Sequence, residues 1–243
     1  QYMPECQLSR EYVVDIGQTD CRGLARPSAI VDFMQDIATR HAEIMGIGGE
    51  ALKQHHGFWV LSRLKYQLER PLQPYETIRL TTLPRKLRGA SWYRDFVFED
   101  AGGVIGHAVT VWAIVDLESR HLLLPKKVGI SFPSQDTGFT EQLRAIVPED
   151  MQPCFARTVR YSDTDVNRHL NNVKAVDILS DAFGLEPDEN RWVSGLQVNY
   201  LAENRCGTEL TISQGHTKNG TFCVCACEGE QEKVQAEVTF SER

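Results

Sequence analysis

Two stretches of this chain have hydrophobic residues at helical spacing, and each stretch ends at a glycine. The first begins at Ser28, after Pro27, and stops at Gly46; its apolar positions are Ile30, Phe33, Met34, Ile37, Ala38, Ile44 and Met45. The second begins near Asn172 and stops at Gly184; its apolar positions are Val173, Val176, Leu179 and Phe183. Such spacing with a terminal glycine predicts one long helix in each half of the chain.

After each helical stretch the period changes to two, which is typical of half-buried strands. The alternating runs cover residues 59–68, 77–83, 91–99 and 105–116 in the first half, and 192–201, 208–215, 221–228 and 233–240 in the second. Short glycine-containing turns separate them, as at 101–103 and 218–220, which favours antiparallel hairpins. An antiparallel sheet that follows a single helix buries it most economically by curling around it.

The two halves also repeat each other in sequence. Residues 14–20 (VDIGQTD) match residues 159–165 (VRYSDTD), and a Trp-Val pair opens the first long strand after each helix. The same order of landmarks predicts an α+β chain of two tandem units, each a long helix wrapped by an antiparallel sheet. We place the first unit at 1–116, a proline-containing linker at 117–152 and the second unit at 153–243.

The halves differ where the repeat carries polar groups. After its Thr-Asp pair the first half reads CRGLARP, whereas the second reads VNRHLNN. In an extended segment Asp165, Asn167 and His169 would alternate by two and face one side, just before a helix N-terminus that favours negative charge. On the following strand, Glu203 occupies the position of Arg70 in the first half. The second half therefore holds the candidate chemistry.

The segment 165–173 (DVNRHLNNV) closely resembles the D-x-N-x-H-x-N-N-V motif of the fatty acyl-ACP thioesterases, double-hotdog enzymes of plants and bacteria. Further segments resemble that family in the same order along nearly the whole chain, namely 35–46, 59–60 with 70–71, and 200–203. The resemblance implies a double hotdog fold and hydrolysis of the thioester that joins a fatty acyl chain to acyl carrier protein (ACP).

Carried over by position, the resemblance implies that Asp165, Asn167, His169 and Glu203 are the active-site residues. Plant members often have cysteine directly after the glutamate, where this chain has Asn204. Cys206 lies two residues further on, and this departure argues against a mechanism with an acylated cysteine.

Thioester hydrolysis needs a base to activate water and donors to stabilise an oxyanion, whereas a thiol of pKa about 8.5 leaves nearly unaided. We assign Glu203 as the base, with His169 and Asn167 holding the water and the carbonyl, and Asp165 fixing their orientation. His169 is an alternative base. Backbone N–H groups near Asn171 and Asn172 would form the oxyanion site, although both asparagines also suit helix capping.

Two further sets of residues are candidates for binding. Acyl carrier proteins are acidic, and a local basic cluster at Arg85, Lys86 and Arg88 is a candidate docking site for the carrier. Apolar residues of the first half are candidates for an acyl-chain pocket, which the resembling family has in that half; core packing is the competing use of the same residues, which are Ile30, Met34, Ile37, Trp59 and Trp92.

Composition narrows the function classes. The formal net charge of −7 over 243 residues argues against nucleic acid as the main partner. The sequence contains no apolar run long enough to span a bilayer and no visible signal peptide, and its seven cysteines include no C-x-x-C pair. Cys223, Cys225 and Cys227 alternate as in a strand, with no histidine nearby to complete a metal site. We expect a cytoplasmic protein without metal or cofactor.

Three other functions fit parts of this pattern. A hotdog thioesterase that acts on acyl-CoA would use the same residues. A hydratase or dehydratase would use an Asp/His pair but would leave Glu203 without a role. A non-catalytic acyl-binding module would need an output domain, and neither a helix-turn-helix nor a basic segment is visible. A homodimer is compatible with all of these functions.

Overall fold

The computed structural model describes residues 6–130 and 136–243. The chain forms two compact units, each built from several segments. Among the described residues, unit 1 comprises 6–12, 33–64, 77–130 and 136–143, and unit 2 comprises 13–32, 65–76 and 144–243. Residues 131–135 of the predicted linker lie outside the described residues. The division of the chain at residues 116 and 153 stays a prediction.

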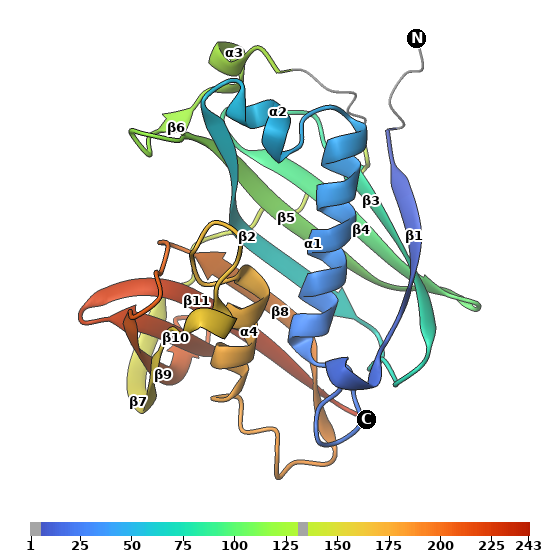
Figure 1. Cartoon of the computed structure of the whole chain (residues 1–243). Helices are drawn as coiled ribbons and strands as arrows, with labels where there is room; N and C mark the ends of the chain where they lie inside the picture. Colours follow the sequence, from blue (N-terminus) through green and yellow to red (C-terminus); the bar gives the residue numbers. More distant parts are fainter. Residues whose placement is uncertain (1–5, 131–135) are drawn as a thin grey trace. The chain divides into compact units, whose positions relative to one another are not determined.

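The first half contributes one long helix and six strands. The helices are α1 (Pro27–Ile44), α2 (Gly49–Lys53) and α3 (Pro125–Val128), with a single 3-10 turn, η1 (Ile16–Gln18). The strands are β1 (Leu8–Val13), β2 (Gly57–Leu68), β3 (Thr77–Pro84), β4 (Trp92–Asp100), β5 (Gly103–Asp116) and β6 (Leu122–Leu123). They lie in the order β1-β3-β4-β5-β2, with β6 paired to β5. Figure 1 shows α1 lying across β3, β4 and β5.

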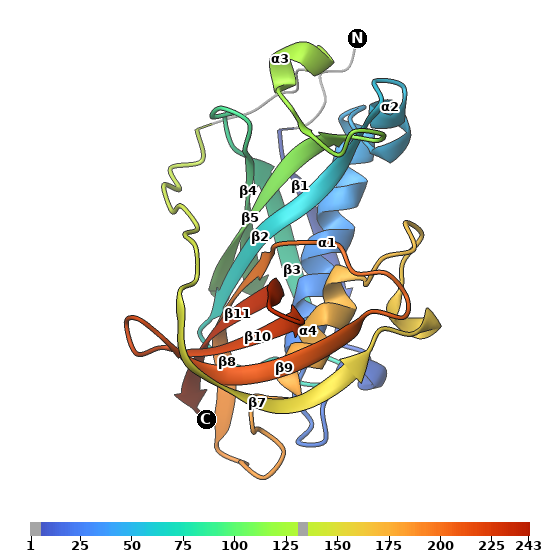
Figure 2. The ribbon, with the colours of Figure 1, turned by 90° about the vertical axis from the view of Figure 1, so that its left-hand side faces the viewer.

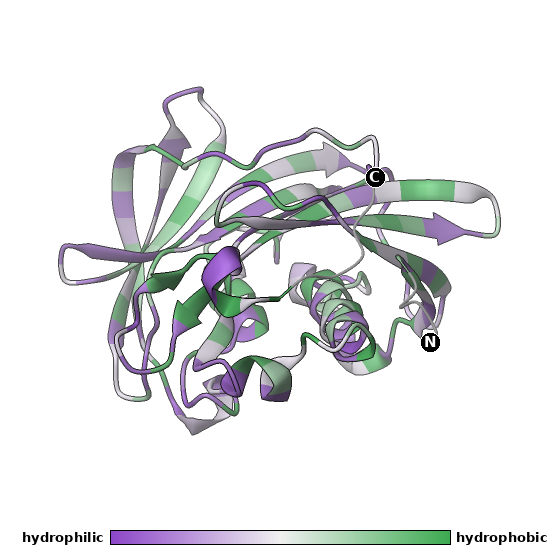
Figure 3. Ribbon diagram, turned by 90° about the horizontal axis from the view of Figure 1, so that it is seen from above, coloured by the Kyte–Doolittle hydropathy of each residue, from purple (hydrophilic) through white to green (hydrophobic). Residues whose placement is uncertain are grey.

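The core of unit 1 forms where the hydrophobic face of α1 packs against the hydrophobic face of the sheet. Met34 and Ile37 of α1 are almost fully buried. Leu80 of β3 and Phe98 of β4 are register partners, and both are fully buried. Every second strand residue therefore faces the helix, and Figure 3 shows this alternation of hydrophobic and hydrophilic residues along the strands.

The second half repeats this plan in unit 2. Its helix is α4 (Asn172–Ser180), preceded by the 3-10 turn η2 (Tyr161–Asp163). Its strands are β7 (Pro148–Thr158), β8 (Arg191–Tyr200), β9 (Glu209–Thr217), β10 (Phe222–Glu228) and β11 (Gln231–Glu242), in the order β8-β11-β10-β9-β7. The buried face of α4 contacts β10, and Figure 2 shows the helix beside these strands.

Both predicted helices and all eight predicted strands are present, and the further strands β1 and β7 precede the two 3-10 turns. The second helix ends at Ser180 rather than near Phe183, because the chain turns before Gly184, which has a φ of 66°. The opening strands β1 and β7 end before Val14 and Val159, so the matching segments of the repeat are turns. β7 starts inside the predicted linker, at Pro148.

Burial of the cysteine row on β10 gives a first prediction. Cys223 and Cys225 are buried, and burial raises the pKa of both thiols, that of Cys223 to about 11. Because the thiolate is the reactive form, iodoacetamide at pH 7.5 should label the three exposed cysteines, Cys21, Cys154 and Cys206, and should reach the buried pair only in denaturant. Peptide mass spectrometry measures this, and native labelling of Cys225 would contradict it.

Candidate active site

The segment that carries the candidate residues is a tight turn rather than the extended segment expected from the sequence. The Asp165 N–H donates to the His169 carbonyl at 3.0 Å, and the Arg168 N–H donates to the Asp165 carbonyl at 2.9 Å. The Asp165 carboxylate accepts the Asn167 N–H at 2.8 Å, which closes the turn from inside. The expectation that the three side chains simply alternate along a strand was therefore wrong.

The first half contains the same turn at the matching position. The Asp20 N–H donates to the Leu24 carbonyl at 2.7 Å, and the Gly23 N–H donates to the Asp20 carbonyl at 3.0 Å. The Asp20 carboxylate accepts the Arg22 N–H at 2.9 Å. Gly23 and Arg168 share a left-handed φ, of 73° and 64° respectively. The repeat in the sequence is therefore a repeat of backbone hydrogen bonds.

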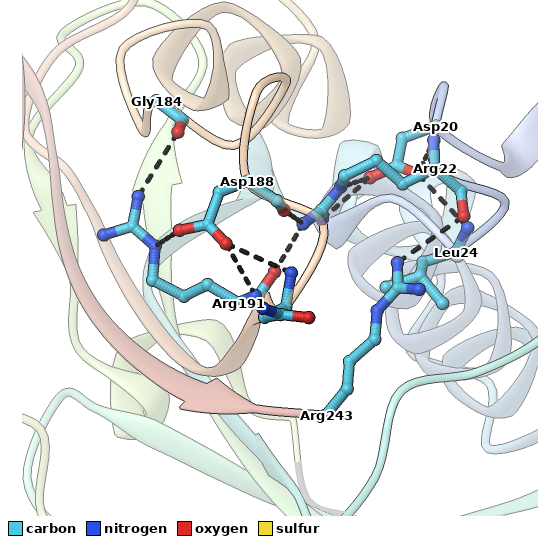
Figure 4. A network of polar contacts seen from close by, with 8 residues as sticks. Asp20, Arg22, Leu24, Gly184, Asp188, Arg191 and Arg243 are labelled. Carbon is cyan, nitrogen blue, oxygen red and sulfur yellow. Dashed lines mark hydrogen bonds and ion pairs between the residues drawn. The ribbon is translucent and has the colours of Figure 1, made fainter.

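The first-half turn uses its side chains for structure. The Arg22 side chain is only 3% exposed and forms an ion pair with Asp20 at 2.9 Å. Its Nη1 donates to the Asp188 carbonyl at 2.9 Å and also to the Arg191 carbonyl. Figure 4 shows this network, in which Asp188 in turn forms an ion pair with Arg191 at 3.2 Å. The repeat in the sequence does not reveal this role of Arg22, because its partners Asp188 and Arg191 lie far away along the chain.

The second-half turn brings an imidazole to a carboxylate. His169 Nε2 lies 3.4 Å from Glu203 Oε2, with the histidine side chain 13% exposed and the glutamate 42% exposed. Backbone contacts hold the two segments together, because Leu170 donates its N–H to the Asn204 carbonyl at 2.6 Å and His169 forms a bridge with Arg205. The matching first-half turn has Leu24 in place of this histidine.

Glu203 lies in a loop rather than on the strand where the sequence placed it. β8 ends at Tyr200, because the N–H groups of Leu201 and Ala202 both turn toward the Lys233 carbonyl, at 2.9 and 3.3 Å. Strand alternation therefore says nothing about the relative directions of the Glu203 and Cys206 side chains. Cys206 is exposed, within the turn that follows.

The asparagines beside the turn begin the helix. Asn171 caps α4, since its side chain accepts the N–H groups of Val173 and Lys174 at 2.8 and 3.3 Å. The buried Tyr200 hydroxyl donates to the Asn172 carbonyl at 2.9 Å. These bonds fix the start of the helix directly after His169. A role for Asn171 and Asn172 in oxyanion binding stays a prediction.

The candidate acyl-pocket residues are packed as core. Ile30, Met34 and Ile37 are buried along α1. The rings of Trp59 and Trp92 meet edge to face at 5.4 Å, within a cluster that includes Leu52, Ile114 and Val128. A cavity that includes Ile30 in its lining measures about 20 Å³, room for about one water molecule and too little for an acyl chain.

One member of the candidate docking cluster, Arg85, forms an internal ion pair, whereas Lys86 and Arg88 are exposed. Arg85 contacts Asp95 through two bonds of 2.6 Å, and the Asp95 side chain is only 2% exposed. Lys86 and Arg88 are exposed on the loop after β3. A charge reversal at Arg85 would set two carboxylates together in a buried site, so it would test stability rather than docking.

Two features are absent from residues 6–130 and 136–243. No helix there is long and apolar enough to cross a membrane. No group of His, Cys, Asp and Glu side chains in those ranges has the arrangement needed to hold a metal ion.

Comparison with protein families identifies the group to which these features belong. Residues 5–125 match the N-terminal domain of the acyl-ACP thioesterases, and residues 151–242 match their C-terminal domain. The chain belongs to the acyl-ACP thioesterase family. The resemblance found in the sequence motif is thereby confirmed.

Solved structures confirm the double hotdog fold expected of this family. A Bacteroides thetaiotaomicron acyl-ACP thioesterase is 25% identical, with a TM-score of 0.87 over 97% of this chain and 98% of its own. The 12:0-ACP thioesterase from Umbellularia californica superimposes with a TM-score of 0.79 at 17% identity, covering 100% of both chains.

A curated relative is the chloroplastic palmitoyl-acyl carrier protein thioesterase of Gossypium hirsutum, 24% identical over 86% of this chain and 55% of its own length. The chain spans about half the length of the curated relatives it matches.

The paired turns predict different consequences for the same substitution. Asp20→Asn keeps an oxygen to accept the Arg22 N–H but removes the charge that compensates the buried guanidinium. We expect it to lower the free energy of unfolding by about 1–3 kcal/mol and to leave turnover of the folded enzyme nearly unchanged. Asp165→Asn also keeps an oxygen to accept the Asn167 N–H, but it removes the negative charge from the turn that carries Asn167 and His169, so we expect it to reduce kcat in a protein that melts close to the wild-type temperature.

Thermal melts and kinetics on the same preparations measure both effects. A well-folded but inactive Asp20→Asn variant would show that the first-half turn takes part in catalysis and would contradict the assignment.

Proposed function

We propose that this protein hydrolyses the thioester of fatty acyl-ACP to give a free fatty acid and ACP. The observation that carries the proposal is the His169–Glu203 pair, 3.4 Å apart, beside a turn whose first-half copy has Leu24 and a buried arginine. Membership of the acyl-ACP thioesterase family supports the reaction class. Seven cysteines without a disulfide among the described residues suit a reducing compartment such as the cytoplasm.

In the proposed reaction, Glu203 accepts a proton from a water molecule as the water oxygen attacks the thioester carbonyl. His169 and Asn167 hold the water and the carbonyl oxygen, which becomes an oxyanion in the tetrahedral intermediate. The carbon–sulfur bond then breaks, and the thiolate of the carrier takes up the proton from Glu203. Asp165 acts through the turn, because its carboxylate fixes the Asn167 backbone.

The geometry favours Glu203 over Cys206 as the group that acts on the substrate. The glutamate is in contact with His169, whereas the cysteine is in an exposed turn and no contact of its thiol with a base is found among the described residues. Between them, Asn204 is buried and donates to the Ala202 carbonyl at 3.2 Å, so it supports the loop. Hydrolysis of acyl-CoA by the same residues is the alternative reaction.

Replacing the carboxylate distinguishes the two mechanisms. Glu203→Gln keeps the size of the side chain but removes the base, so kcat on acyl-ACP should fall by ~10²–10⁴. Cys206→Ala should keep most of the activity. Release of free thiol from acyl-ACP and acyl-CoA, read with a chromogenic thiol reagent, measures both variants and both carriers.

The matched control is Cys154→Ala, because Cys154 is another exposed cysteine of unit 2. An acyl group trapped on Cys206 in an active Glu203→Gln enzyme would overturn the proposed mechanism.

A further inference from the structure

Two hydrophobic side chains project into solvent beside the candidate active site. Val166, in the turn itself, is 98% exposed, and Tyr161, in η2, is 89% exposed. These are the largest exposures among the large hydrophobic residues that the structure describes. Apolar groups exposed to this degree on two adjoining turns indicate a surface that contacts another molecule.

Three arginines surround the same turns. Arg168 lies in the turn, Arg205 follows Glu203, and Arg160 precedes Tyr161; all three are exposed. Within the described part of the chain, none of their side chains forms an ion pair. Backbone bonds bring the segments together, since the Leu170 N–H donates to Asn204 at 2.6 Å and the Val159 N–H donates to Thr208 at 2.9 Å.

The acidic groups of these segments are engaged internally. Asp163 is buried and pairs with Arg157 at 2.7 Å. Asp165 accepts the Asn167 N–H, and Glu203 contacts His169. The three exposed arginines therefore outnumber the two partly exposed carboxylates beside them, Asp165 and Glu203, on a chain whose formal net charge is −7.

We infer that this surface, the arginine rim, docks an acidic carrier protein so that its thioester reaches the His169–Glu203 pair. The arginine rim consists of Arg160, Tyr161, Val166, Arg168 and Arg205. The inference rests on the proposed function, and it places docking in the second half of the chain rather than at Arg85, Lys86 and Arg88.

Charge and exposed apolar side chains both support docking at the arginine rim. A positive rim on a negative protein attracts an acidic partner only at short range, because the Debye length is about 8 Å at physiological salt. Attraction over that distance orients the partner and raises the association rate. The exposed Tyr161 and Val166, adjacent in sequence to Arg160 and close to Arg168, then supply apolar contact beside the cations, and tyrosine and arginine are enriched in protein interfaces.

The test reverses two of the charges. In Arg168→Glu with Arg205→Glu, KM for acyl-ACP should rise about tenfold or more at low salt, since steering of this kind changes association by 10–10³. Hydrolysis of a neutral acyl-N-acetylcysteamine thioester should change less than about twofold. The wild-type KM for acyl-ACP should increase with salt, and the salt dependence of the variant should be much weaker.

A second variant controls for net charge. Lys126→Glu with Lys127→Glu alters the charge equally on the exposed helix α3, and it should leave KM for acyl-ACP unchanged. Lys86→Glu with Arg88→Glu examines the competing surface. A large rise in KM for that variant, with none for the arginine-rim variant, would overturn the inference. Equal losses on acyl-ACP and on the neutral thioester would overturn it as well.

A direct binding measurement distinguishes carrier docking from thioester hydrolysis. Titration calorimetry with holo-ACP, which carries no acyl group, should give a measurable affinity that the arginine-rim variant loses. Wild-type protein that hydrolyses the neutral thioester but binds no holo-ACP would overturn the docking inference alone. Protein that binds holo-ACP at the rim but hydrolyses no thioester would overturn the proposed function and leave the docking surface intact.

Discussion

The structure around the site depends on one kind of hydrogen bond. An aspartate carboxylate accepts the backbone N–H of the residue two positions further along the chain. It occurs at Asp20 with Arg22 and at Asp165 with Asn167, at 2.9 and 2.8 Å. In each half it closes the turn between the opening strand and the helix. The side chains that the turn displays can then vary without altering the backbone, because the constraint resides in the aspartate.

This arrangement accounts for the different roles of the two copies. The first displays Arg22, whose guanidinium is buried and satisfied by one carboxylate and two backbone carbonyls. A buried cation held by several hydrogen bonds rigidifies its surroundings, and breaking those bonds would be costly. The second copy displays Asn167 and His169 beside the partly exposed Glu203. One turn therefore supports the fold, and its duplicate presents the candidate chemistry.

The sequence predicted most of the fold, because the periods of 3.6 and 2 are strong over long elements such as α1 and β5. It failed where short-range hydrogen bonds override the period. Residues 165–169 alternate as a strand would, but the Asp165 carboxylate folds them into a turn. Glu203 likewise falls beyond β8, because Leu201 and Ala202 both donate to the Lys233 carbonyl. A linear pattern does not contain these bonds.

Side-chain partners explain the remaining gap between sequence and site. Arg85 reads as a free cation in sequence, yet it is committed to the buried Asp95, ten residues away. Arg168 and Arg205 read as scattered surface charges, yet the backbone bonds around His169 bring their segments together. An arginine is informative about binding only when it forms no ion pair within the protein. Among the described residues beside the candidate site, Arg168 and Arg205 meet that condition, which is why the proposed docking surface becomes visible only in the structure.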